Sequence, residues 1–102
     1  MDLQLNPGKF EERQAVLVNE LAKTIQVKLT EAGLDSDKIS ELTLSLAFSI
    51  TSVIDGISGI EADRMDVRPY LTFQIDDELV HCGENSFMHE LVYDVVGRLI
   101  GD

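Results

Sequence analysis

The chain has 102 residues, 44% of them hydrophobic, and a formal net charge of -11. This length and apolar content predict one domain over residues 1–102 with a packed core, and they argue against disorder. The acidic balance argues against nucleic acid or an anionic membrane as partner, because a basic patch supplies most of the affinity for either.

The cysteine count and the hydropathy pattern bear on the location of the protein. Cys82 is the single cysteine, so no disulfide can form within the chain, which fits a reducing compartment. The N-terminus lacks the basic segment and apolar run of a secretory signal. The central uncharged stretch from Leu42 to Ile54 is shorter than the ~20 residues that a membrane span needs. We therefore expect a soluble, cytoplasmic protein.

The first predicted helix begins at Asn6-Pro7. The Asn6 side chain can cap the helix, and Pro7 suits the first helical position because its missing N–H is not needed there. Gly33 ends the helix, because glycine adopts a left-handed conformation without steric cost. Between these points apolar residues recur at spacings of three and four and form one helical face: Leu17, Val18, Leu21, Ala22, Ile25, Leu29 and Ala32.

The most apolar stretch of the chain runs from Ile39 to Ile60 and forms the second predicted helix. Asp35 or Ser36 can cap its start. The link to the first helix is only a few residues long, so residues 7–58 should form an antiparallel helical hairpin. Because the second helix is apolar on nearly every side, we expect the rest of the chain to bury it on most sides.

The central stretch is open to other interpretations. From residue 42 to residue 51 large apolar and small residues also alternate, which is typical of a strand, but the length, the preceding cap and a stripe at helical spacing favour a helix. That stripe consists of Ile39, Leu42, Leu46, Ile50, Val53 and Ile57. Ser45, Ser49 and Ser52 form a row of small residues where another helix can approach. The alternative is a ligand-binding row, although buried serines more often bond to carbonyls of their own helix.

The segment from Glu61 to Arg68 is the most charged part of the chain and should lie on the surface. Arg64 and Arg68 can share one face of a turn, as in a phosphate clamp. Pairing of these arginines with neighbouring carboxylates is the favoured interpretation.

Two strands, residues 70–75 and 79–82, are predicted to form an antiparallel hairpin, because apolar residues alternate along the first of them. A two-residue turn pairs odd positions with even ones, so Cys82 shares the face of Phe73 and His81 lies on the other face. The turn itself is acidic and consists of Asp76, Asp77 and Glu78.

A third helix follows the hairpin, with Asn85 or Ser86 as its cap and Gly101 at its end. Its apolar face consists of Met88, Leu91, Val92, Val95 and Leu99. The prediction is therefore an α+β fold of order α-α-β-β-α, in which the helical hairpin and the C-terminal helix pack on a two-stranded antiparallel hairpin. A lone two-stranded hairpin is marginal in water and consists of edges. We expect a homodimer that joins two hairpins into a four-stranded sheet.

Three residues have the chemistry of metal ligands or of a nucleophile with its base: His81, Cys82 and His89. Their spacing matches no zinc pattern, because there is no CxxC and no second histidine four residues after His89. The hairpin register also separates His81 from Cys82. Cys82 with His89 as its base is the corresponding catalytic hypothesis. A packed thiol and two partly exposed histidines are favoured, so we predict no metal, no cofactor and no catalytic residue.

Three classes of function remain. The favoured one is a small, non-catalytic interaction or accessory module that forms a homodimer, because the polar residues fall on surfaces and turns and do not converge. The turn at Asp76, Asp77 and Glu78 is the candidate surface for a basic partner, as in an acidic inhibitor, an immunity-type protein or a DNA mimic. The second class is an enzyme or a metal-binding protein that uses the region of His81, Cys82 and His89. The third is a small-ligand binder, with that same region or a pocket between the central helix and the sheet as its site.

Overall fold

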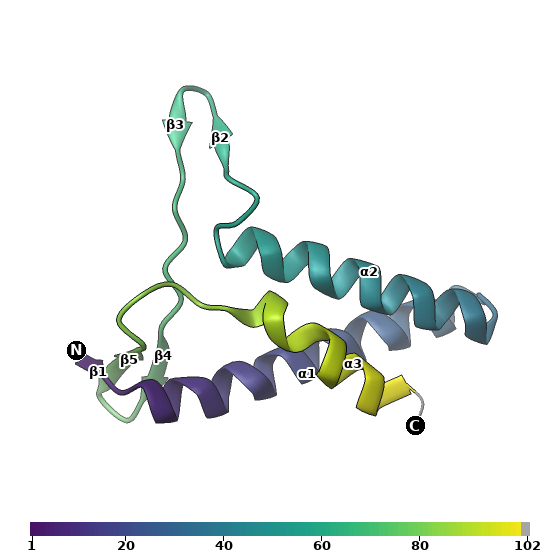
Figure 1. Cartoon of the computed structure of the whole chain (residues 1–102), viewed down its shortest axis with the longest axis horizontal. Helices are drawn as coiled ribbons and strands as arrows, with labels where there is room; N and C mark the ends of the chain where they lie inside the picture. Colours follow the sequence, from purple (N-terminus) through teal and green to yellow (C-terminus); the bar gives the residue numbers. More distant parts are fainter. Residues whose placement is uncertain (101–102) are drawn as a thin grey trace.

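Three α-helices and a small mixed sheet make up residues 1–100, the part of the chain that the computed structural model describes. This confirms the predicted α+β class. The order of elements is β1, α1, α2, β2, β3, β4, β5, a 3₁₀ turn η1 and α3. In Figure 1, α1 and α2 run side by side, the sheet lies at the start of α1, and a thin arm formed by β2 and β3 projects from the end of α2. The predicted helix end at Gly101 lies outside the described residues.

Helix α1 (Pro7–Glu31) begins where the Asn6-Pro7 pattern predicts. The Asn6 side chain accepts a hydrogen bond from the backbone N–H of Lys9 at 3.2 Å, and Pro7 occupies the first helical position. Beyond the end of the helix, Gly33 has a φ of 83°. The left-handed glycine reverses the chain toward α2, as predicted.

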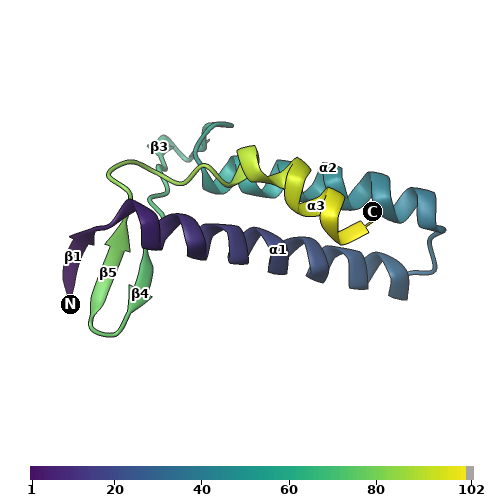
Figure 2. The same ribbon diagram turned by 60° about the horizontal axis from the view of Figure 1, so that its bottom comes forward.

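Helix α2 (Ser36–Ile54) completes the helical hairpin predicted for residues 7–58, and it rules out the strand alternative. The Asp35 carboxylate caps α2 by accepting from the backbone N–H of Lys38 at 2.9 Å. Gly56, with a φ of 81°, follows the last residues of the helix. Figure 2 shows α1 and α2 side by side, with α3 packed along them.

The burial of α2 contradicts the prediction that the rest of the chain covers it on most sides. The buried residues of α2 are small or polar: Thr43, Ala47, Thr51 and Ser52. Ala47 belongs to the same core cluster as Val18 and Ala22 of α1. By contrast, Leu46 and Ile50 of the apolar stripe are each 39% exposed. The physical reason is the spacing of the helices, because small side chains at the contact let α1 and α2 approach closely and leave the large ones outside.

The sheet has three strands in the order β1-β5-β4, one strand more than predicted. β4 (Phe73–Ile75) and β5 (Glu78–His81) pair antiparallel with Phe73 opposite Val80, which confirms the two-residue turn and its register. β1 (Asp2–Leu5) pairs in parallel with the other side of β5 and is absent from the prediction. Two copies joined at their sheet edges would therefore have six strands rather than four.

The charged segment after α2, predicted as a surface connector, forms a hairpin arm. β2 (Glu61–Ala62) and β3 (Met65–Asp66) pair antiparallel across a turn at Asp63 and Arg64. Every residue from 61 to 68 is exposed, which confirms the predicted surface position.

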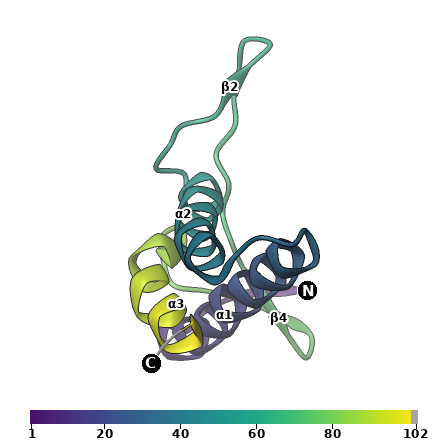
Figure 3. The same cartoon turned by 90° about the vertical axis from the view of Figure 1, so that its right-hand side faces the viewer.

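The arm carries its own ion pair and stands apart from the helices. The Arg68 Nε donates to the Asp66 carboxylate at 2.8 Å, so the predicted local pairing is present at this arginine. In Figure 3 the arm rises from α2 on the side away from α1.

The C-terminal segment consists of η1 (Met88–Leu91) and α3 (Val92–Ile100). Its predicted apolar face is confirmed, with Met88 and Val92 fully buried. The predicted cap at Asn85 or Ser86 is wrong, because Phe87 occupies the cap position and no local side chain bonds to the first turn. The side chains of Gln14, in α1, and of Asp55, directly after α2, accept hydrogen bonds from N–H groups at the start of this segment instead.

Candidate functional site

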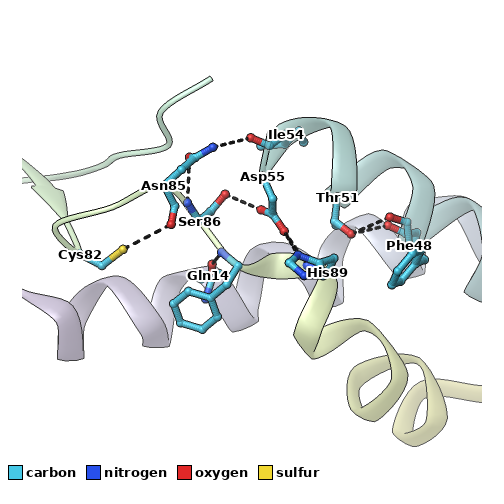
Figure 4. Close-up of polar contacts among 11 residues, drawn as sticks. Gln14, Phe48, Thr51, Ile54, Asp55, Cys82, Asn85, Ser86 and His89 are labelled. Atoms are coloured by element: carbon cyan, nitrogen blue, oxygen red, sulfur yellow. Dashed lines mark hydrogen bonds and ion pairs between the residues drawn. The ribbon is translucent and has the colours of Figure 1, made fainter. Parts of the chain in front are cut away.

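A buried carboxylate, Asp55, joins the end of α2 to the start of η1. Its side chain is 1% exposed. One oxygen accepts a hydrogen bond from the hydroxyl of Ser86. The other accepts from the backbone N–H of His89 at 2.8 Å and from its ring Nδ1 at 2.6 Å (Figure 4). Because an ionised carboxylate is costly to bury without partners, these three bonds are what holds Asp55 in the interior.

Two amide side chains extend this network to other elements. The Oε1 of Gln14, a fully buried residue of α1, accepts from the backbone N–H of Phe87 at 2.7 Å. The Asn85 side chain accepts from the N–H of Leu71 at 3.0 Å and donates to the carbonyl of Ile54 at 3.1 Å. Gln14 and the buried carboxylate thus satisfy N–H groups at the start of η1, which explains the missing local cap.

Asp55, Ser86 and His89 match a catalytic triad in composition but not in geometry. In a triad the imidazole lies between the carboxylate and the hydroxyl and takes the proton of the nucleophile. Here the Ser86 hydroxyl donates to the carboxylate itself, so its proton is not directed at His89. The imidazole packs edge-on against Phe48, with ring centroids 6.1 Å apart. The arrangement therefore works as a junction between helices.

The structure does not bring His81, Cys82 and His89 together. The Nδ1 of His81 accepts from the Tyr70 hydroxyl at 2.8 Å and from a backbone N–H at 3.2 Å. The Cys82 thiol donates to a backbone carbonyl at 3.1 Å. Figure 4 shows Cys82 and His89 at opposite ends of the network. Within residues 1–100, no group of three or more His, Cys, Asp or Glu side chains is arranged to hold a metal ion.

The acidic turn lies at the tip of the sheet. Asp76, Asp77 and Glu78 are all exposed, and Asp76 has a φ of 54° in the turn. The parallel pairing of β1 adds a fourth carboxylate, because Asp2 lies opposite Glu78. Solubility alone accounts for an exposed acidic cluster of this kind, so the cluster does not by itself define a binding site.

Neither Asp55 nor Gln14 is among the predicted site residues, although each has a local signal. Gln14 lies four residues from both Phe10 and Val18, on the buried face of α1, where a polar side chain needs a partner. Asp55 is the first charge after the uncharged stretch of α2 and precedes a glycine. These signals do not identify the partners, which lie 73 and 34 residues away in the sequence.

A stripe of large apolar side chains along α2, predicted from its spacing to lie in the core, is instead partly exposed. Its members are between 39% and 58% exposed, and we call them the open face: Leu46, Ile50, Val53 and Ile57. Residues two apart on a helix point about 200° from each other. Leu46 and Ile50 therefore point away from Phe48, which contacts Tyr93 of α3. The open face lies on the side of the helical hairpin that α3 leaves uncovered.

The predicted serine row is divided between surface and interior. Ser45 and Ser49 are exposed and, with Phe48 and Tyr93, line a shallow groove of about 370 Å³ between α2 and α3. Ser52 is buried, and its hydroxyl has no hydrogen-bond partner within residues 1–100. The helices of this chain therefore do not use Ser45 and Ser49 as a surface for close approach.

The chain exposes more surface than its size requires. Its accessible surface is 6676 Å², whereas a folded monomer of this mass exposes about 5,700 Å². Its radius of gyration is 15.2 Å, compared with about 12.8 Å for a compact domain of this length. The open face and the projecting arm are the parts that depart from a compact body.

Neither membrane segments nor known relatives indicate a function. Within residues 1–100, each helix is too short or too polar to cross a lipid bilayer. Comparisons of the chain with protein-family models, with curated proteins and with solved structures find no match.

Proposed function

We propose that this chain is a small, non-catalytic protein–protein interaction module that acts as a homodimer joined through the open face of α2. The observation that carries the proposal is the exposure of Leu46, Ile50, Val53 and Ile57, which lie in one stripe and are 39% to 58% exposed. Monomeric proteins rarely leave large contiguous apolar patches in water, and such patches mark interaction sites.

Surface area favours a second copy of the chain as the partner. The accessible surface exceeds that of a compact monomer by roughly 1,000 Å². A standard interface buries about 800 Å² on each partner. The extra accessible surface of the chain is therefore about as large as the surface that one such interface would bury.

Charge favours the same partner. Helix α2 carries no charge between Glu41 and Asp55, so two copies packed at the open face bury no charged group there. The net charge of -11 per chain remains on the outer surfaces. A two-fold axis brings the same patch of both subunits together, so that patch must fit a copy of itself. An uncharged apolar stripe meets this requirement, because it brings no like charges together.

The spacing of the stripe fits a straight contact between helices. From Ile39 to Val53 its residues recur at intervals of three and four that repeat after 11 residues, a period that stays on one side of an α-helix, and Ile57 follows just beyond the helix end. Ser45 and Ser49 lie beside the stripe, and small residues allow a neighbouring helix to come close. We assign the dimer contact to α2 rather than to the sheet edge, because β4 has only three residues and short edge strands oppose pairing.

The hydrogen bonds of the candidate catalytic groups support a module without catalysis. Asp55 and Ser86 bond to each other, and the Cys82 thiol bonds to a backbone carbonyl. Neither the Ser86 hydroxyl nor the Cys82 thiol is therefore directed at a histidine that could act as its base.

Sedimentation equilibrium on the wild type and two variants tests the proposal. Ile50→Glu places a charge at the centre of the open face. Val27→Glu, at a 52% exposed residue of α1, is the matched control because it changes the net charge equally. We expect wild type and Val27→Glu to be dimers at high micromolar concentration. We expect Ile50→Glu to weaken dimerisation by roughly 100-fold with an unchanged far-UV circular dichroism spectrum. A wild type that stays monomeric would reject the proposal.

A further inference from the structure

We infer that in the dimer the arm, residues 60–68, closes over the helical hairpin of the partner and buries its own apolar side chains there. This inference rests on the proposed homodimer and adds a second contact to it. The arm and the open face together then form one continuous interface between two copies of the chain.

The arm has a defined structure. The backbone N–H of Val67 donates to the carbonyl of Ile60 at 2.9 Å, so the two sides of the arm are joined from its base. At its tip, φ is 51° at Asp63 and 66° at Arg64. Residues other than glycine adopt such values where a tight hairpin turn requires them. The turn and this hydrogen bond therefore give the arm the shape of a hairpin.

Within residues 1–100, no other strand of the subunit pairs with the arm, and the apolar side chains of the arm stay exposed. Within residues 1–100, β2 and β3 pair only with each other, and an isolated two-stranded hairpin is marginal in water. Met65 is 60% exposed and Val67 is 44% exposed. Figures 1 and 3 show the arm standing away from the helices and from the main sheet. A surface that covered Met65 and Val67 would supply the stability that this hairpin lacks.

The arm continues the open face of α2. Ile57, which is 58% exposed, lies just beyond the end of the helix and leads into the arm. The stretch from Ile57 to Arg64 spans at most about 25 Å when extended. Packed helices lie about 8–10 Å apart. An arm that rises beside the α2 of the partner is therefore long enough to reach the α1 of the partner as well.

The charges favour an antiparallel arrangement of the two α2 helices. The N-terminal end of α2 carries Asp35 and Asp37, so a parallel pair would bring two acidic ends together. In an antiparallel pair each acidic end meets the arm of the other subunit. Arg64 at the arm tip forms no ion pair within residues 1–100 and in this arrangement can pair with one of those acids, while Arg68 is already paired with Asp66 and the arm also carries Glu61 and Asp63.

The dimer dissociation constant of an arm variant tests the inference. Met65→Ser with Val67→Ser removes the apolar contacts of the arm and leaves the body of the subunit unchanged. Leu3→Ser with Leu5→Ser is the matched control, because it removes two exposed apolar side chains of β1, 56% and 62% exposed, at the other end of α1 from the start of α2. We expect the arm variant to raise the dissociation constant by roughly tenfold. The control should keep the dissociation constant of the wild type.

Trypsin cleavage after Arg64 supplies a second measurement that keeps the wild-type arm. Above the dimer dissociation constant, we expect wild type to be cleaved there roughly tenfold more slowly than the monomeric Ile50→Glu variant, because the partner covers the tip. An arm variant that dimerises as tightly as wild type, or a tip cleaved equally fast in monomer and dimer, overturns the inference and leaves the homodimer intact. A wild type without dimers overturns both.

Discussion

The side of α2 that faces α1 carries small and polar residues, whereas its exposed side carries large apolar ones. Apolarity alone predicts the reverse. The inner face, toward α1, consists of Thr43, Ala47 and Thr51, all of them fully buried. The outer face carries Leu46 and Ile50, each 39% exposed. This difference indicates that small residues at the contact allow the two long helices to pack closely. The large apolar side chains Leu46 and Ile50 stay partly exposed beside that contact.

The comparison can be tested by substitutions on each face in the Ile50→Glu background, where dimerisation does not add to the measured stability. Urea unfolding followed by circular dichroism gives the free energy of unfolding in each case.

The largest expected loss of stability is at Asp55, the buried residue directly after α2. Asp55→Ala leaves Ser86 and His89 without the acceptor that they share, and we expect a loss of about 3–5 kcal/mol in the free energy of unfolding. Asp77→Ala, at an exposed acid of the sheet turn, should change it by less than about 0.5 kcal/mol. Equal effects at the two positions would show that the buried junction does not hold the helices together.

A medium effect is expected from equal additions of volume to the two faces. Ala47→Leu forces a large side chain between α1 and α2 and should lower the free energy of unfolding by about 1–3 kcal/mol. Ser49→Leu adds similar volume on the exposed side, and we expect a change within about 0.5 kcal/mol. If Ser49→Leu proved the more costly, the assignment of inner and outer faces would be reversed.

The smallest expected effects have opposite signs and concern two buried hydroxyls of the inner face. The Thr43 hydroxyl has no hydrogen-bond partner within residues 1–100, so Thr43→Val should raise the free energy of unfolding by about 1 kcal/mol. The Thr51 hydroxyl donates to the carbonyl of Ala47 at 2.8 Å, so Thr51→Val should lower it by about 0.5–1 kcal/mol. Two changes of the same sign would contradict this account of the inner face.

Features determined by a few neighbouring residues could be predicted from the sequence. The Asn6 and Asp35 caps and the turn at residues 76–77 each depend on side chains within three or four positions, and all three are present in the structure. In each case the backbone N–H and its acceptor, or the two paired strands, are close in the sequence. The α+β class follows from the same local patterns.

Features that depend on distant partners could not be predicted in the same way. β1 has four exposed residues and no buried face, so its sequence carries no alternation, and it pairs with a strand that begins at Glu78. Hydrophobic spacing identified the stripe on α2 but not its exposure on the surface of the subunit. In the buried junction only His89 was a predicted candidate, because its partner Asp55 is recognisable only once the helices are packed.

The way in which η1 begins has a consequence for the order of folding. Its first N–H groups are held by Gln14 and Asp55, which lie 73 and 34 residues earlier in the chain than their partners. During synthesis α1 and α2 are made first, and their contacts span a short stretch of sequence, which favours fast formation. The last helix has no cap of its own and docks only onto a hairpin that already exists. Val18 and Ala47 share one core cluster with Met88 and Val92, so their burial is completed only after the C-terminal residues have been made.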